Sequence, residues 1–120
     1  YHRVGSFSTS SGYEMMNQLL NDNGKQLPTF LFAENDAIAI GALRALQEAD
    51  IAVPDQISVV GFNDSKVAKY VYPPLSSIRV DTREMGRTGV SLLLDRIAYP
   101  RKISKKISLS TEWIKRASTK

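Results

Sequence analysis

The feature of this sequence that most constrains its fold is a short apolar run ending on an asparagine and an aspartate, and it occurs twice, in residues 30–36 and residues 58–64. A run of four or five apolar residues with polar residues at its end is typical of a strand buried in a parallel sheet. Residues 36–49, between the two runs, have the composition of a helix. Strand, helix and strand in this order form a βαβ unit, whose crossover is right-handed in about 98% of cases. The sequence therefore predicts an α/β fold with a parallel sheet flanked by helices.

Further elements extend this unit in both directions. Residues 3–7 have the pattern of a weak strand and are followed by a helix, so the first half of the chain is expected to form a βαβαβ arrangement. In the second half, a short strand is expected at 77–80 and the longest helix at 82–98, with Asp81 as its N-cap. A last strand is expected within residues 106–114, where apolar and charged residues alternate.

The polar residues at the strand ends are the candidate site. The carboxyl ends of parallel strands share one edge of the sheet, where ligands of open α/β sheets bind, so Phe7, Asn35 and Asn63 are expected to face one crevice. An amide donates and accepts hydrogen bonds at once, which suits sugar hydroxyls. Helix capping or turn formation explains the two asparagines equally well on their own, and their shared edge favours ligand contact. For Asp36 and Asp64 the structural role is favoured, and for Phe7 burial in the core is the commoner alternative.

Two apolar stretches suggest surfaces that need a partner. Residues 36–49 are apolar nearly all round, whereas a helix that covers one face of a sheet needs a single apolar stripe. Another part of the protein or a second subunit must therefore cover the surplus, and the small residues Gly41, Ala42 and Ala45 allow close approach. The stiff, apolar stretch 70–75 could contact a second subunit or pack against its own domain, and the residues alone do not separate these alternatives.

Composition argues against several kinds of chemistry. The chain has no cysteine and one histidine, His2, which excludes disulfides and argues against histidine-dependent triads and multi-histidine metal sites. No glycine-rich phosphate loop is present, because Gly86 and Gly89 fall within the expected helix. We therefore expect no enzyme activity and no metal or other cofactor.

The charges are distributed unevenly. Residues 1–95 carry 8 basic and 11 acidic side chains, a net −3, whereas residues 96–120 carry 8 basic and 1 acidic, a net +7. The favoured interpretation of the basic end is a solvated edge strand that its lysines protect from aggregation, and direct DNA contact is the alternative.

The sequence carries no sign of membrane insertion or export. No apolar run approaches the roughly 20 residues that span a bilayer, and no signal-peptide pattern is present, so a cytoplasmic protein without membrane contact is expected. The chain starts at Tyr1 rather than methionine, and we expect it to be part of a longer protein.

Three ordered motifs carry a family resemblance. Residues 32–46 (FAENDAIAIGALRAL), 53–64 (VPDQISVVGFND) and 73–78 (PPLSSI) closely resemble the lactose/galactose repressor (LacI/GalR) family of bacterial transcription regulators, with support from Ser11-Gly12-Tyr13 and Met85-Gly86. The resemblance implies a periplasmic-binding-protein-like domain of two α/β subdomains with a small molecule between them. It also implies that residues 1–75 and about 106–114 form the C-terminal subdomain, and that about 76–105 cross to the N-terminal subdomain.

The resemblance also implies roles for single residues. Asn35 matches the effector-contacting asparagine of the family's Asn-Asp motif, and Phe7 aligns with an aromatic residue that packs on the sugar in some members. Asn63 stands where many members have an aspartate, so this chain departs from the pattern there. Family dimers use the helix after the Asn-Asp motif and the Pro-Pro region, which implies an interface of Ile38, Ala42, Ala45, Leu46, Tyr70, Tyr72 and Pro73.

The function implied is that of a transcriptional repressor part which senses an effector and dimerises. The effector is expected to be a sugar, and operator DNA is expected to bind through a helix-turn-helix domain that lies outside this chain. A periplasmic sugar-binding protein of a transport system shares the fold and is the alternative.

Overall fold

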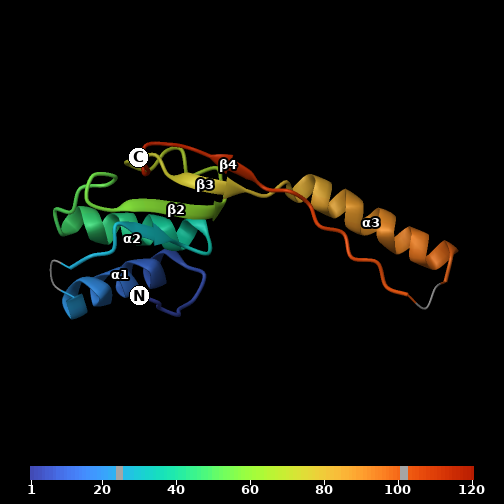
Figure 1. The fold of residues 1–120 in the computed structure, drawn as a ribbon, viewed down its shortest axis with the longest axis horizontal. Coiled ribbons are helices and arrows are strands. Elements are labelled where there is room, and N and C mark those ends of the chain that lie inside the picture. Colours follow the sequence, from blue (N-terminus) through green and yellow to red (C-terminus); the bar gives the residue numbers. More distant parts are fainter. Residues whose placement is uncertain (24–25, 101–102) are drawn as a thin grey trace.

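The computed structural model of the chain describes residues 1–23, 26–100 and 103–120. A compact part holds the sheet and two helices, and the third helix extends away from it, so the molecule measures 59 × 25 × 21 Å (Figure 1). In chain order the elements are α1 (Thr9–Asn23), β1 (Phe30–Phe32), α2 (Asp36–Glu48), β2 (Ser58–Asn63), β3 (Ser76–Arg79), α3 (Thr82–Ala98) and β4 (Glu112–Ile114).

The four strands form one sheet in the order β1-β2-β3-β4. The pairs β1–β2 and β2–β3 are parallel, and β4 is antiparallel to β3. The apolar centre of β2 is buried between its neighbours, with Val59 at 0% exposure, as expected of a strand inside a parallel sheet. The expected α/β architecture with a predominantly parallel sheet is confirmed.

Helix α1 covers the second apolar face of α2, and α2 packs against β2 (Figure 1). The two helices approach closely because Gly12 and Gly41 face the opposite helix. A side chain at Gly12 would clash with the Ile38 carbonyl, and one at Gly41 with the Thr9 carbonyl. The Tyr13 hydroxyl also donates a hydrogen bond to Glu48, and this bond, followed by that from Arg44, lowers the pKa of Glu48.

This packing corrects part of the expected dimer interface. The side chains of Ala42, Ala45 and Leu46 are 3%, 0% and 0% exposed in the single chain. These three residues are therefore covered within the chain itself, where α1 packs on α2, and not by a second subunit. Ile38 is half-buried and packs against the same core.

The expected strand at residues 3–7 is absent, and this prediction was wrong. Local side-chain bonds replace strand pairing there: the Ser6 N–H donates to Ser11 Oγ at 3.0 Å, and Arg3 pairs with Asp22 at 2.7 Å. Serine hydroxyls compete with the ladder in this way. β1 therefore forms the edge of the sheet in the described part of the chain.

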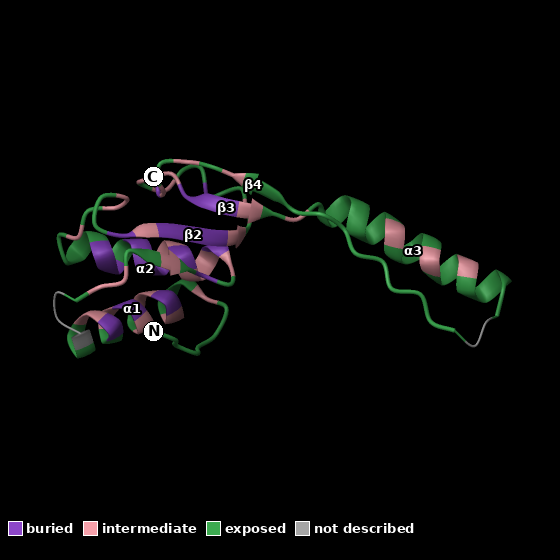
Figure 2. Cartoon of the chain, viewed as in Figure 1, coloured by how far each residue is buried: buried purple, intermediate pink, exposed green. Residues whose placement is uncertain are grey.

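Helix α3 has no buried residue in the structure (Figure 2). It begins at its expected N-cap, since the Asp81 carboxylate accepts a hydrogen bond from the Glu84 N–H at 2.9 Å. One set of its exposed side chains is apolar and consists of Met85, Val90, Leu93, Leu94 and Ile97.

The boundaries of the part that leaves the compact body differ from those expected. β3 pairs with β2 inside the sheet, so the chain leaves after Arg79 rather than at residue 76. It returns as β4 at Glu112, because residues 106–111 are not paired as a strand. Residues 101 and 102 of the expected crossing segment lie outside the described residues.

The C-terminal tail is anchored in the compact part through Ser118, which is 0% exposed. Its backbone pairs with Val59 and Pro74, its hydroxyl donates to Val59 O at 2.6 Å, and the hydroxyl accepts from Ser76 N–H at 2.8 Å. Ser118 thereby bonds β2 at Val59, one residue before Val60, where the pairing of β2 with β3 begins.

Candidate functional site

The polar edge of the sheet lies where the parallel strands end and helices α1 and α2 begin (Figure 1). Phe32 of β1 pairs with Val60 of β2. Asn35 and Asn63 each follow one of these paired residues by three positions, so both asparagines stand at the same edge. This is the edge at which ligands of open α/β sheets bind.

Asn35 combines a helix cap with spare hydrogen-bonding capacity. It is the N-cap of α2, where its Oδ1 accepts a hydrogen bond from the Ile38 N–H at 2.8 Å. Its Nδ2 group has no bond to the described residues and can donate to a ligand. The structural and the ligand-binding roles considered for this residue are therefore compatible, because they use different atoms.

Asn63 is exposed at the end of β2 and has a backbone φ of 95°. Asp64 follows with a φ of 50°, so two successive residues adopt left-handed conformations. Asparagine and aspartate tolerate this region better than other residues with a Cβ. The Asn63 amide makes no hydrogen bond within the parts of the chain that are described, and both its donor and its acceptor are available.

Asp36 is buried beneath this edge and serves the fold. Its Oδ1 accepts a hydrogen bond from Ser77 Oγ at 2.6 Å, and its Oδ2 accepts one from the Ser65 N–H. The approach requires Gly61, because a Cβ there would clash with the Asp36 carboxylate. Asp36 thus ties the start of α2 to the loop after β2 and to β3.

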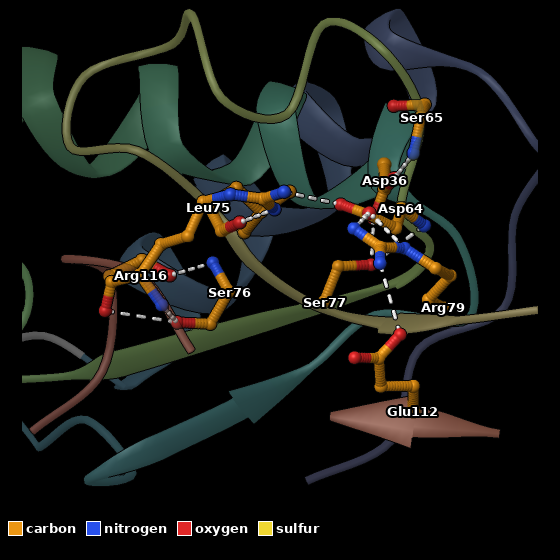
Figure 3. A network of polar contacts seen from close by, with 10 residues as sticks. Asp36, Asp64, Ser65, Leu75, Ser76, Ser77, Arg79, Glu112 and Arg116 are labelled. Carbon is orange, nitrogen blue, oxygen red and sulfur yellow. Dashed lines mark hydrogen bonds and ion pairs between the residues drawn. The ribbon is translucent and has the colours of Figure 1, made fainter. Parts of the chain in front are cut away.

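Asp64 is the centre of a second group of contacts (Figure 3). Its side chain is 7% exposed and pairs with Arg116 at 2.6 Å and with Arg79 at 2.7 Å. Its N–H donates to Ser77 Oγ at 3.0 Å, and Arg79 also pairs with Glu112 at 3.0 Å. These contacts support the structural role favoured for Asp36 and Asp64.

The ion pairs determine how Asp64 titrates. Burial of its carboxyl acts to raise the pKa, but the hydrogen bonds from Arg116 and Arg79 and their positive charges outweigh this effect and hold the pKa below its usual value. The hydrogen bond to Asp64 in turn raises the pKa of the Arg79 guanidinium. Asp64 is therefore ionised at neutral pH, and the turn carries a fixed negative charge that two arginines compensate.

Local sequence patterns did not indicate these arginines. Arg79 lies within the strand expected at 77–80, and its place beside Asn63 follows from strand pairing only once β2 and β3 are known to be neighbours. Arg116 lies 52 residues from Asp64 in the sequence, and only the return of the tail brings the two together.

Phe7 lies in the loop before α1 and is 70% exposed. Because Thr9 and Gly12 pack against Gly41 and Ile38, the start of α1 is held against the first turns of α2. Phe7 lies two residues before this end of α1, and it makes no ring contact within the described residues.

The remaining interface candidates lie in the loop between β2 and β3. Tyr70 and Tyr72 are 76% and 83% exposed, and Pro73 is half-buried. Tyr72 also lines a shallow hollow together with Ile40, Leu43, Arg44, Gln47, Glu48 and Val71.

Other kinds of site have no support in the described residues. They contain no group of three or more His, Cys, Asp or Glu side chains that could hold a metal ion. Nor does any helix within them have the length and apolar character needed to cross a membrane.

Comparison with known proteins identifies the family. The model of the periplasmic binding protein-like domain matches residues 1–119. The transcriptional regulator GalR of Streptococcus thermophilus is 49% identical over 117 residues, which are 98% of this chain and 35% of that regulator. The chain thus spans about a third of the length of this curated relative.

Solved structures agree with this result. The complex of the transcriptional regulator CelR with cellobiose superposes with a TM-score of 0.85 at 34% identity, covering 95% of this chain and 34% of that one. The Lac repressor dimer bound to operator and the anti-inducer ONPF superposes with a TM-score of 0.86 at 34% identity, covering 96% of this chain and 39% of that one. The chain therefore belongs to the periplasmic binding protein-like domain family, as the effector-domain part of a LacI/GalR-type regulator.

Proposed function

We propose that this chain is the effector-sensing and dimerising part of a cytoplasmic transcriptional repressor that responds to a sugar. The observation that carries the proposal is the pair of available amides, Asn35 and Asn63, at the carboxyl edge of a parallel sheet. Amides at this edge can bind adjacent hydroxyl groups. The relatives support regulation over transport, because GalR and CelR are both transcriptional regulators. They support a sugar as the effector, because CelR forms a complex with cellobiose.

The proposed site is one wall of a cleft. Asn35 and Asn63 would contact the sugar from the compact part, and Phe7 would pack against a sugar face. Helix α3 supports the existence of an opposite wall, because a helix with five large exposed apolar side chains is stable when another structure covers them. That cover would be the N-terminal subdomain of the full-length protein, and operator DNA would bind through a helix-turn-helix domain that precedes it.

Asn63 would also influence which sugar is bound. An aspartate in this position accepts charge-assisted hydrogen bonds, whereas an asparagine offers one donor and one acceptor without charge. The substitution would favour a sugar that presents both a donor and an acceptor to this residue.

The proposed dimer surface is the outer side of α2 and the adjacent loop. It retains Tyr70, Tyr72 and Pro73, and the hollow beside Tyr72 adds Ile40 and Val71. It excludes Ala42, Ala45 and Leu46, which are buried within the chain itself.

The dimer surface can be tested with two charge substitutions in the full-length protein. Ile40→Asp is expected to halve the mass measured by light scattering while the helical circular dichroism is retained, because a charge disfavours burial against a partner. Ala45→Asp, which introduces the same charge at a 0% exposed position, is expected to unfold the domain instead. An unchanged mass for Ile40→Asp would place the dimer contact elsewhere.

The function can be tested by a thermal-shift screen of neutral sugars on the full-length protein, followed by operator binding with and without each hit. A ligand that binds the folded state raises the melting temperature, and the true effector should also change operator affinity. A protein that binds sugar but no DNA would support the transport alternative. A folded protein whose melting temperature no sugar changes would contradict the proposal.

A further inference from the structure

Three residues from three strands form one row at the polar edge. Asn63 of β2 pairs with Arg79 of β3, and Arg79 pairs with Glu112 of β4. The first residue of this row is the proposed sugar contact. The other two mark the points where the chain leaves the compact part toward α3 and returns from it.

The side chain of Arg79 connects Glu112 to Asp64, the residue that follows Asn63 (Figure 3). Its Nε and Nη2 lie 2.8 Å and 2.7 Å from Asp64 Oδ2, and its Nη1 lies 3.0 Å from Glu112 Oε2. A guanidinium presents its donors in a rigid plane, so it can hold two carboxylates in a defined relative position. Arg79 therefore fixes the left-handed turn at Asn63 and Asp64 relative to both crossing segments.

The contribution of Arg79 to fold stability is small by comparison with that of Arg116. The side chain of Arg79 is 46% exposed and that of Glu112 is 64% exposed, so the ion pair between them contributes little to stability. Asp64 is 7% exposed, but without Arg79 it keeps its second partner, Arg116. Arg116 is 17% exposed and holds the other oxygen of Asp64 and the Leu75 carbonyl. Arg116 thus holds Asp64 in the folded compact part, whereas Arg79 connects Asp64 to the segments that cross toward α3.

We propose that Arg79 is a positioning residue that links the effector-binding turn to the two segments crossing toward α3, and so conveys effector occupancy to the rest of the regulator. The inference rests on the proposed function, since it assigns a regulatory role to a residue beside the same site. Effector binding at Asn63 changes the turn, the turn moves Asp64, and Arg79 passes this displacement to the ends of β3 and β4.

The test uses Arg79→Met in the full-length protein with the sugar identified by the screen. Two quantities are measured: the sugar Kd by calorimetry, and the ratio of operator Kd values with and without saturating sugar. Loss of hydrogen bonds to a charged group predicts a sugar affinity about tenfold weaker and an operator ratio reduced by about the same factor. Arg79→Lys, which keeps the charge, is expected to restore part of both effects.

Arg3→Met is the control for the loss of an ion-paired arginine, because Arg3 pairs with Asp22 on the N-terminal segment, away from the crossing. It should leave both quantities unchanged. Glu112→Gln supplies a second variant that weakens one half of the connection without touching Asp64, and it should lower the operator ratio even if Arg79→Met lowers the melting temperature.

The outcomes separate this inference from the function on which it rests. If the unmodified protein responds to sugar while Arg79→Met and Glu112→Gln keep its sugar affinity and operator ratio, the role of Arg79 is refuted and the proposed function stands. If the unmodified protein does not respond to any sugar, both fall together. A change confined to melting temperature in both variants would make Arg79 a purely structural residue and would overturn the inference.

Discussion

Asn63→Gly in the full-length protein is the most direct test of the proposed sugar contact. Asn63 has a φ of 95°, a conformation that glycine adopts without strain and that costs other residues about 1–3 kcal/mol. Alanine would therefore combine the loss of the amide with backbone strain, whereas glycine removes the amide alone. Because this amide has no partner in the described part of the chain, its removal breaks no contact of the fold.

The expected magnitude follows from the hydrogen bonds that the amide can make. One donated and one accepted bond to sugar hydroxyls contribute about 0.5–1.5 kcal/mol each. Their loss weakens binding by about 1–3 kcal/mol, and 1.4 kcal/mol corresponds to about tenfold in affinity. Sugar affinity is therefore expected to fall by about tenfold or more.

Calorimetric titration with the effector measures this loss. Asp50→Gly is the matched control, because Asp50 is also exposed and has a φ of 56°, but lies between α2 and β2 at the opposite edge of the sheet. The two variants share the effect of glycine on the unfolded chain, so they should have similar melting temperatures, and only Asn63→Gly should lose affinity. If Asn63→Gly binds the effector as tightly as Asp50→Gly does, Asn63 is not a sugar contact.

Three further predictions follow from the geometry of the edge and the tail. Asn35→Asp keeps the capping oxygen and loses the Nδ2 donor, so sugar affinity measured by calorimetry should fall about tenfold while the melting temperature is retained. A melting temperature that falls together with the affinity would show that the helix cap was disturbed. Ser118→Ala leaves the buried Val59 carbonyl and the buried Ser76 N–H without the Ser118 hydroxyl as partner, so the free energy of unfolding measured in urea should fall by about 2–4 kcal/mol. The exposed Ser108→Ala should lower it by less than about 0.5 kcal/mol, and equal stabilities of the two variants would rule out the anchoring role of the tail. Folding lowers the pKa of Asp64, so the stability that this carboxylate contributes is present above its usual pKa of about 4 and is lost as the pH falls below that value. The melting temperature of Asp64→Asn should therefore decline less steeply at low pH than that of the unmodified protein.

Elements whose signal is local could be predicted from the sequence. The helix at 82–98 has the N-cap that the sequence indicates, Asp81. The apolar run that ends at Asn63 is a buried strand, as its pattern predicts. The shared edge of Asn35 and Asn63 followed from the parallel strands of a βαβ unit, whose carboxyl ends meet at one edge of the sheet. These inferences needed only neighbouring residues and one geometric rule.

Features that depend on distant contacts could not be predicted in this way. The apolar surplus of α2 shows that a cover is needed, but the same pattern suits a helix of the same chain and a second subunit. The complementary glycines at positions 12 and 41 decide between them, and their apposition appears only in three dimensions. The burial of Ser118 likewise depends on a tail that returns after the α3 excursion, for which a lone polar residue near the end of a chain gives no signal.

The two Asn-Asp pairs show how one edge can be both rigid and open. In each pair the oxygens of the aspartate accept hydrogen bonds from serines or arginines of the protein, and the asparagine keeps hydrogen-bonding capacity that the proposed effector could use. A carboxylate held in this way keeps its turn in place, whereas an available amide can exchange water for ligand hydroxyls at little cost. In the proposed mechanism, effector binding therefore needs no folding step at this edge, and its free energy is available for the displacement of the Asn63–Asp64 turn that Arg79 passes to the segments leading to α3. Because both outward positions carry amides rather than carboxylates, that exchange involves no change of charge and favours a neutral, hydroxyl-rich effector over a cationic one.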